Sequence, residues 1–348
     1  MKENLPQKLY VDALVDDFTE HFSLLAGRKL TSIFFGGGTP SLFSAHAIND
    51  ILTAINRYIS FSSTLEITLE ANPGTIDQAH FKDYRHAGIN RLSLGIQSLQ
   101  NEKLKILGRI HDREHALKAI KIAREAGFTN VNLDLMYGLP QQSIADALED
   151  MQTALAFAPA HFSWYQLTIE PNTFFHHQPP VLPADDLIWE MQLAGQALLQ
   201  QAGLHQYEVS AYALANQQCA HNRNYWEFGD YLGMGAGAHS KITQHERIIR
   251  FSQVKNPRDY LIRDKKQLAT QAILSQEDLI FEFMLNALRL TDGIEKSLFT
   301  IRTGIRLETI QTLLDEAYAR GWLNLHPDKI QPSELGKRYL NDLVGLFL

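Results

Sequence analysis

The chain has 348 residues, of which 45% are hydrophobic and 20% charged, with a formal charge of −7 and one cysteine, Cys219. This composition excludes a disordered chain and argues against a general nucleic-acid binder, which needs a basic surface. No apolar run reaches the roughly 18 residues of a membrane span, and the N-terminus lacks a signal-peptide core, so we expect a cytoplasmic protein. One cysteine excludes an internal disulfide and any site built from three cysteine ligands of this chain.

The predicted elements begin with a helix over Tyr10–Ala26, where apolar residues recur at helical spacing. A buried strand follows at Ser32–Phe35, and a second helix carries Ile48 and Ile55 on one face. Strands and helices then alternate. The further strands are predicted at Leu65–Glu70, Arg91–Gly95, Val131–Met136, Phe162–Thr168 and Tyr207–Ser210, and the further helices at Asp77–Ala87, Arg113–Ala126, Ile144–Phe157 and Asp185–Ala202.

This alternation is typical of parallel β/α units and predicts an α/β fold, a partial (β/α)6 TIM-like barrel. Because the series opens with a helix, we expect the first barrel strand to be missing or to lie before Met1. We predict a barrel over residues 1–239, a connector with a strand hairpin over 240–274, and a small winged-helix-like α+β domain over 275–348. The last segment has more acidic than basic residues, so we expect no DNA binding.

Polar groups follow the carboxyl ends of the predicted strands, where barrels of this type hold their active sites. They are the glycine-rich turn Gly36–Pro40, Glu70, Gln97, Arg109 and Asp134. Asp134 lies between apolar neighbours in a strand and needs a partner or a function, because an unpaired buried charge is costly. Together these residues predict a site for a polar, charged cofactor, whereas each one alone is equally typical of a turn or a solvated charge.

A second group of candidate residues follows the last predicted strand, in the string His221-Asn-Arg-Asn-Tyr-Trp226. Imidazole ligates iron, and Tyr225 and Trp226 can stack on a flat macrocycle. The alternative is a loop packed on the barrel rim with a satisfied histidine. His239 and Cys219 have the same two interpretations, as ligands or as packed side chains.

Six strings occur in the order GGGTPS, EANPG, RLSLGIQS, LGRIH, NLDLMYGLP and HNRNYW. In this order and spacing they resemble the radical-SAM proteins related to oxygen-independent coproporphyrinogen III oxidase. Within that group, the HNxxYW string and the segment Trp164–Thr173 resemble the HemW-type heme chaperones. The resemblance extends over essentially the whole chain.

The resemblance implies a heme chaperone that binds heme and S-adenosylmethionine and delivers heme to an acceptor protein, by family analogy a respiratory-chain protein. Gly37, Gly38, Thr39 and Glu70 would hold S-adenosylmethionine. Gln97, Arg109 and Asp134 match positions where the oxidase relatives contact a second S-adenosylmethionine. His221, with Tyr225 and Trp226, would bind heme, His221 as a ligand of the heme iron.

The resemblance also implies a [4Fe–4S] cluster held by a C-x₃-C-x₂-C motif, which is absent from these 348 residues. Two alternatives follow. The natural protein is longer at its N-terminus, or this is a relative that lost the cluster and only binds ligands. Enzymatic activity is therefore left open, with oxygen-independent oxidation of coproporphyrinogen III, a step of porphyrin biosynthesis, as the alternative function.

Overall fold

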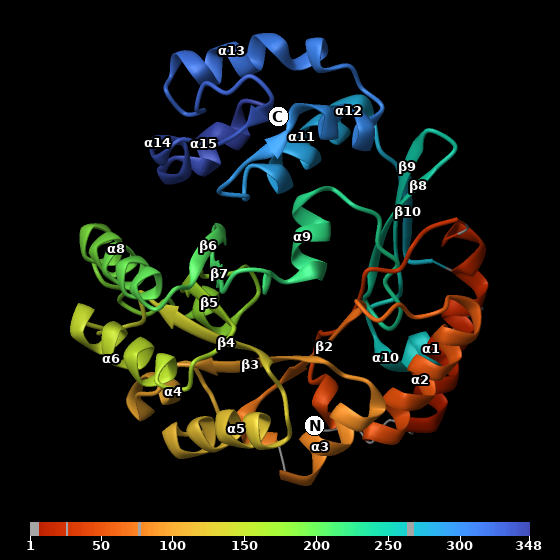
Figure 1. Ribbon diagram of the computed structural model, residues 1–348, viewed down its shortest axis with the longest axis vertical. Helices are drawn as coiled ribbons and strands as arrows, with labels where there is room; N and C mark the ends of the chain where they lie inside the picture. The colour runs from red at the N-terminus through yellow and green to blue at the C-terminus, as the bar shows by residue number, and fades with distance from the viewer. Residues whose placement is uncertain (1–6, 26, 76–77, 263–267) are drawn as a thin grey trace. The chain divides into compact units, whose positions relative to one another are not determined.

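The computed structural model describes residues 7–25, 27–75, 78–262 and 268–348. The chain forms two compact units, which we describe separately (Figure 1). Unit 1 comprises residues 1–31, 49–64 and 220–348, and unit 2 comprises residues 32–48 and 65–219. The domain boundaries expected at residues 239/240 and 274/275 stay predictions.

Unit 2 is built on a seven-stranded sheet with the strand order β1-β2-β3-β4-β5-β7-β6. The strands are β1 Ser32–Phe35, β2 Glu66–Ala71, β3 Arg91–Gln97, β4 Asn130–Tyr137, β5 His161–Gln166, β6 His205–Glu208 and β7 Ala211–Ala213. Strands β1 to β5 pair in parallel, each with its sequence neighbour. The predicted α/β fold with parallel β/α units is thereby confirmed.

The prediction of one further barrel strand at Tyr207–Ser210 is wrong. The segment forms a hairpin instead, in which β7 runs antiparallel to both β5 and β6. The Glu208 carboxylate stabilises the turn, because it accepts the backbone N–H of Ser210 at 3.1 Å and its hydroxyl at 2.9 Å. The apolar run is too short for its periodicity to show two strands and a turn.

Helices line one side of this sheet (Figure 1). They are α3 Gln78–Ala87, α4 Asn101–Ile106, α5 Arg113–Glu125, α6 Ile144–Leu155 and α8 Asp185–Gln201. The short helix α7, Phe174–His177, and the 3-10 turns Pro40–Leu42 and Pro73–Thr75 lie in the loops of this unit. Helix α2, Ala45–Tyr58, is shared between the units. The pattern Ser143-x-x-Asp146 in the sequence predicts a capping box at the start of α6, and this is confirmed. Asp77, the first residue of one predicted helix, lies outside the described residues.

Unit 1 contains a three-stranded antiparallel sheet, β10-β9-β8. Its elements up to this sheet are α1 Gln7–His21, the 3-10 turn Phe22–Leu25, α9 Ala220–Trp226, β8 His239–Gln244, β9 Arg247–Ser252, α10 Pro257–Ile262 and β10 Thr270–Ile273. Strands β8 and β9 form a hairpin where the sequence predicts one. Ala26, the last residue of the predicted first helix, lies outside the described residues.

The rest of unit 1 is mainly helical. Its elements are α11 Gln276–Ala287, β11 Ile294–Glu295, α12 Lys296–Thr303, the 3-10 turn Leu307–Ile310, α13 Gln311–Ala319, β12 Lys329–Ile330, α14 Glu334–Arg338 and α15 Leu340–Gly345. The sequence also predicts a short strand pair around Leu323–Leu325 and Lys329–Gln331. Leu323 and Pro332 form an isolated antiparallel bridge there, and β12 pairs in addition with β11, a strand that precedes α12. The helix that the sequence predicts from about Glu334 to the end is interrupted at Tyr339, whose ψ of 41° is not helical.

Asp17 joins helix α1 to the rest of unit 1. This carboxylate is 1% exposed. It accepts hydrogen bonds from the Tyr260 hydroxyl at 2.7 Å, the Gln253 amide at 2.8 Å and the Gly235 N–H at 3.3 Å. The N-terminal helix is therefore part of the core formed by residues more than 200 positions later.

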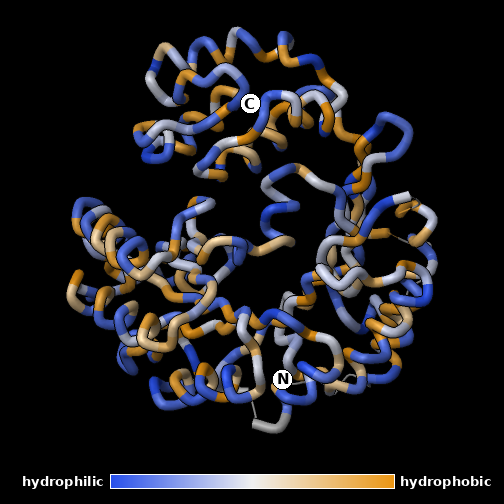
Figure 2. Tube along the Cα trace, viewed as in Figure 1, coloured by the Kyte–Doolittle hydropathy of each residue, from blue (hydrophilic) through white to orange (hydrophobic). Residues whose placement is uncertain are grey.

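Hydrophobic and hydrophilic residues alternate at short intervals along the helices of both units (Figure 2). This is the pattern of helices with one buried face. Among the residues that the structure describes, no helix combines the length and the apolar character needed to cross a membrane.

Candidate functional site

The first part of the candidate site lies at the carboxyl ends of β1 and β2. The backbone N–H of Gly37 donates to the Glu70 carboxylate at 3.3 Å. Gly37 and Gly38 have φ values of +77° and +58°, which glycine adopts without strain. Thr39 then caps the 3-10 turn at Pro40–Leu42. The glycine turn and the acid predicted to act together are therefore in contact.

A second carboxylate, Asp134 of β4, acts on the first. Burial and the negative charge of Asp134 raise the pKa of Glu70, and the Gly37 hydrogen bond partly offsets this rise. Burial also raises the pKa of Asp134, against the hydrogen bonds of Ser163, Asn132 and Ser93. The neighbouring carboxylates of Glu70 and Asp134, both partly buried, favour a ligand that carries positive charge or hydrogen-bond donors.

Gln97 and Arg109 complete the site through two residues to which the sequence analysis gave no role. The hydroxyl of Tyr165, on β5, donates to the Gln97 side chain at 2.5 Å. Arg109 donates to the Asn72 amide oxygen at 3.5 Å. Burial raises the pKa of Tyr165, and the charges of Asp134 and Arg109 both act on it.

The structure therefore brings five predicted residues, Gly37, Glu70, Gln97, Arg109 and Asp134, around one edge of the sheet. Gly38 and Thr39 follow Gly37 in the same turn. Gln97 ends β3 with φ +68°, and the register between β3 and β4 shifts there. This left-handed backbone lets β3 stop with the Gln97 amide against the Tyr165 hydroxyl.

Sequence reasoning missed the side chains that surround Asp134. Asn132 donates to Asp134 at 2.7 Å, and the Ser93 hydroxyl donates at 3.1 Å. One indication was present in the sequence, because Asn132 and Asp134 are two residues apart and so share one face of a strand. The contribution of the neighbouring strand was not visible without the sheet register.

The second group of candidates, His221, Tyr225 and Trp226, lies on helix α9 and not in a loop. The rings of His221 and Tyr225 meet edge to face with centroids 6.4 Å apart, as expected for positions i and i+4. His221 is 9% exposed. The Arg289 guanidinium lies 4.2 Å from the centroid of the Trp226 ring, so one face of that ring is covered.

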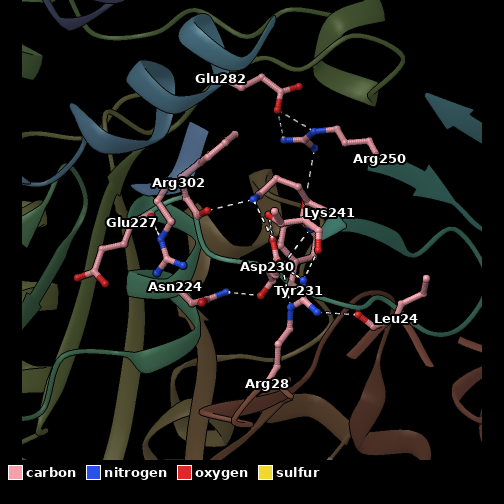
Figure 3. A network of polar contacts seen from close by, with 12 residues as sticks. Leu24, Arg28, Asn224, Glu227, Asp230, Tyr231, Lys241, Arg250, Glu282 and Arg302 are labelled. Carbon is pink, nitrogen blue, oxygen red and sulfur yellow. Dashed lines mark hydrogen bonds and ion pairs between the residues drawn. The ribbon is translucent and has the colours of Figure 1, made fainter. Parts of the chain in front are cut away.

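A polar network fixes the carboxyl end of α9 (Figure 3). Asn224 donates to the backbone oxygen of Asp230 at 2.9 Å, and Arg302 of α12 donates to that of Glu227 at 3.1 Å. The Asp230 carboxylate also accepts from Arg28 at 2.9 Å. Lys241 lies 3.5 Å from Asp230, and burial lowers its pKa to about 8.

The other two candidates lie outside this network. His239 is exposed at the start of β8. Cys219 is buried, with its sulfur 3.7 Å from the Glu66 carboxylate. Because the chain has one cysteine, its residues do not fit a [4Fe–4S] cluster, which needs several thiolate ligands.

Comparisons with known proteins cover the whole chain. Residues 6–154 match the Radical SAM superfamily, and residues 274–339 match the HemN C-terminal domain. The heme chaperone HemW of Escherichia coli is 45% identical over 349 residues, which span 100% of this chain and 92% of the relative. The heme chaperone HemW of Bacillus subtilis is 31% identical over 352 residues, which span 99% and 93%.

Among solved structures, coproporphyrinogen III oxidase (HemN) from Escherichia coli, a radical SAM enzyme, superposes with a TM-score of 0.82. The superposition covers 100% of this chain and 84% of that chain, at 22% identity. This likeness shows the fold, a curled, TIM-like half-barrel, and confirms the predicted class.

Proposed function

The chain belongs to the HemW family of heme chaperones in the radical SAM superfamily, and on this premise we propose that it binds S-adenosylmethionine in unit 2 and carries heme on helix α9. The observation that carries the first half is that Gly37, Glu70, Asp134, Gln97 and Arg109 gather around one edge of the sheet, with Gly37 hydrogen-bonded to Glu70 and the charge of Asp134 acting on Glu70. The second half rests on the HNxxYW string of α9 and on the names of the relatives.

The residues at the sheet edge fit S-adenosylmethionine by their chemistry. The cofactor supplies a sulfonium and an ammonium group, whose positive charges complement two carboxylates. The backbone groups of Gly37, Gly38 and Thr39 would hold the methionine end, with Glu70 accepting from its ammonium group. Asp134 would accept from a hydroxyl, while Gln97 and Arg109 would offer donors to a second polar group or a second cofactor molecule.

The superfamily implies a [4Fe–4S] cluster, and these residues do not fit it. We therefore assign no radical step to this chain. The alternative function, oxidation of coproporphyrinogen III, rests on a structural likeness at 22% identity, which shows the fold alone.

Heme is the cargo in this proposal. His221 would ligate its iron, and Tyr225 and the other face of Trp226 would pack on the porphyrin. Because His221 is 9% exposed, ligation requires its side chain to become accessible. The recipient would be a heme-acceptor protein, by family analogy a respiratory-chain protein. The cytoplasmic location expected from the sequence stays a prediction.

A hemin titration tests the proposal. We expect the wild-type chain to shift the Soret band of hemin, and His221→Ala to weaken that binding at least about tenfold, because iron ligation contributes most of the specific affinity. His205→Ala, which removes an exposed histidine on β6, is the matched control and keeps wild-type binding. An unchanged titration for His221→Ala would reject the assigned ligand, and no Soret shift with the wild type would reject heme carriage.

A further inference from the structure

A chain of buried hydrogen bonds leads away from Asp134 through Asn132. Asn132 joins Asp134 to His161, whose Nδ1 lies 2.7 Å from the Asn132 amide oxygen. The other ring nitrogen of His161, Nε2, lies 2.9 Å from the Tyr207 hydroxyl. That hydroxyl also accepts the backbone N–H of Cys219 at 3.4 Å. His161 is 1% exposed and has no role in the site described so far.

Asn132 uses its whole hydrogen-bonding capacity in this chain. Its Nδ2 group donates to the Asp134 carboxylate at 2.7 Å and to the Ser93 hydroxyl at 2.8 Å. Its oxygen accepts from His161 and, at 3.1 Å, from the Ser163 hydroxyl. The amide has this orientation because the reverse one would turn its oxygen toward a carboxylate.

The orientation of Asn132 determines the protonation of His161. The Asn132 oxygen can only accept, so Nδ1 of His161 must carry the proton that it donates. Nε2 then accepts from the Tyr207 hydroxyl, which stays protonated because burial raises the pKa of Tyr207. With Nδ1 as the donor to Asn132, the neutral form of His161 is the Nδ1–H tautomer.

From this geometry we propose that His161 is a positioning residue for the ligand site. By fixing Asn132, it holds the Asp134 carboxylate as a hydrogen-bond acceptor that is aimed at a donor group of the ligand. The proposal rests on the proposed function for the identity of that ligand, S-adenosylmethionine, and deepens it. The chemistry that Asp134 selects is a hydroxyl or a cation and not an anionic group.

Other charged and titratable groups also act on Asp134. Glu70 and the phenol of Tyr165 interact with its charge from β2 and β5, and Arg91 of β3 favours its ionised form. The hydrogen bonds described above lead from His161 to Asp134 through Asn132, and we expect a change at His161 to act on Asp134 along this route.

The first test needs no ligand. Nitrogen-15 NMR of His161 should show the Nδ1–H tautomer across neutral pH, and carbon-13 NMR should follow the Asp134 carboxyl. In His161→Phe we expect the pKa of Asp134 to rise by about 1, because Asn132 no longer donates in a fixed direction. His161→Gln keeps a donor and an acceptor and should restore the wild-type value. The Nε2–H tautomer, or an Asp134 titration indifferent to His161→Phe, would overturn the proposal.

The second test measures S-adenosylmethionine binding by calorimetry. We expect His161→Phe to weaken binding about tenfold and His161→Gln to stay within about threefold of the wild type. Tyr207→Phe removes the last hydroxyl of the chain and should also weaken binding. Its matched control is Tyr212→Phe, which removes another buried hydroxyl of the same hairpin, bonded to Gln196, and should not. Equal losses in the two tyrosine variants would show a merely structural effect.

The two tests separate the two proposals. If the wild type does not bind S-adenosylmethionine but the Asp134 titration responds to His161→Phe, the proposed ligand is wrong and the positioning role stands. If binding is present and neither measurement responds, the positioning role is wrong and the ligand stands. Should His161→Phe fail to fold, the tautomer of the wild type and the tyrosine pair decide the outcome.

Discussion

At the level of single residues, two carboxylates of unit 2 have different partners and different roles, Asp134 at the proposed ligand site and Asp150 in the core. Asp134 has three hydrogen-bonding neighbours and faces the proposed ligand. Asp150 of α6 is fully buried away from that position and accepts the Ser98 hydroxyl at 2.6 Å. Since Ser98 follows Gln97, Asp150 fixes the turn that ends β3. Burial raises the pKa of Asp150 to about 6.

Asp150 predicts a pH dependence of stability. The folded chain binds this proton more tightly than the unfolded chain, whose carboxyl titrates near 3.9, so its contribution to stability falls as pH rises from about 4 to about 6. The loss amounts to about 2–3 kcal/mol. Urea unfolding at several pH values should show that Asp150→Asn lacks this loss. Glu114→Gln, which changes an exposed carboxylate, should show the same dependence of stability on pH as the wild type. If the stability of Asp150→Asn fell with pH as much as that of the wild type, the loss would not come from Asp150.

At the scale of elements, helix α9 is short and depends on its neighbours for order. Seven residues form less than two turns, too few for a helix to be stable by itself. The Arg302–Glu227 hydrogen bond connects its carboxyl end to α12, and the Arg289–Trp226 contact connects it to the segment that follows α11. Helix α12 and this segment therefore hold the helix on which we place heme.

We expect Arg302→Ala to loosen α9. Loss of one charged hydrogen bond of about 1.5 kcal/mol should speed amide exchange at the end of α9 about tenfold, as measured by hydrogen exchange and mass spectrometry. Arg320→Ala, which breaks an exposed i,i+4 ion pair with Glu316 on α13, should leave exchange in α9 unchanged. Exchange in α9 that does not respond to Arg302→Ala would show that the helix is ordered by other contacts.

At the scale of the whole molecule, each unit is assembled from separated parts of the chain. Unit 1 takes its first helix from residues before unit 2 and its sheet from residues after it. Asp17 joins these two parts of unit 1, because groups from residues 235, 253 and 260 donate to its carboxylate. The stability of unit 1 therefore depends on the N-terminal helix.

Asp17→Ala should therefore destabilise the protein by about 3 kcal/mol or more, since it leaves several buried donors without their acceptor. Asp12→Ala on the same helix, whose partner Lys8 is exposed, should cost less than about 1 kcal/mol. Thermal or urea unfolding of the two variants measures the difference. Similar stabilities for the two would mean that α1 contributes little to the core of unit 1.

Local sequence patterns were enough to predict the parallel β/α units, the capping box at Ser143 and the strands that carry Gly37, Glu70, Gln97 and Asp134 at or near their ends. These follow from local periodicity and from the rule that parallel strands end at one edge. The family also followed from the order of six short strings.

The side chains that surround those residues depend on how the strands pair, which local sequence patterns do not record. Tyr165 meets Gln97, and His161 reaches Asp134 through Asn132, because the sheet register places β3, β4 and β5 side by side. The pairing of β11 with β12 was missed for the same reason, whereas the β6–β7 hairpin was missed because its apolar run is too short to show two strands and a turn. Such contacts join residues far apart in the chain, and no local pattern records which partner a buried polar group will meet.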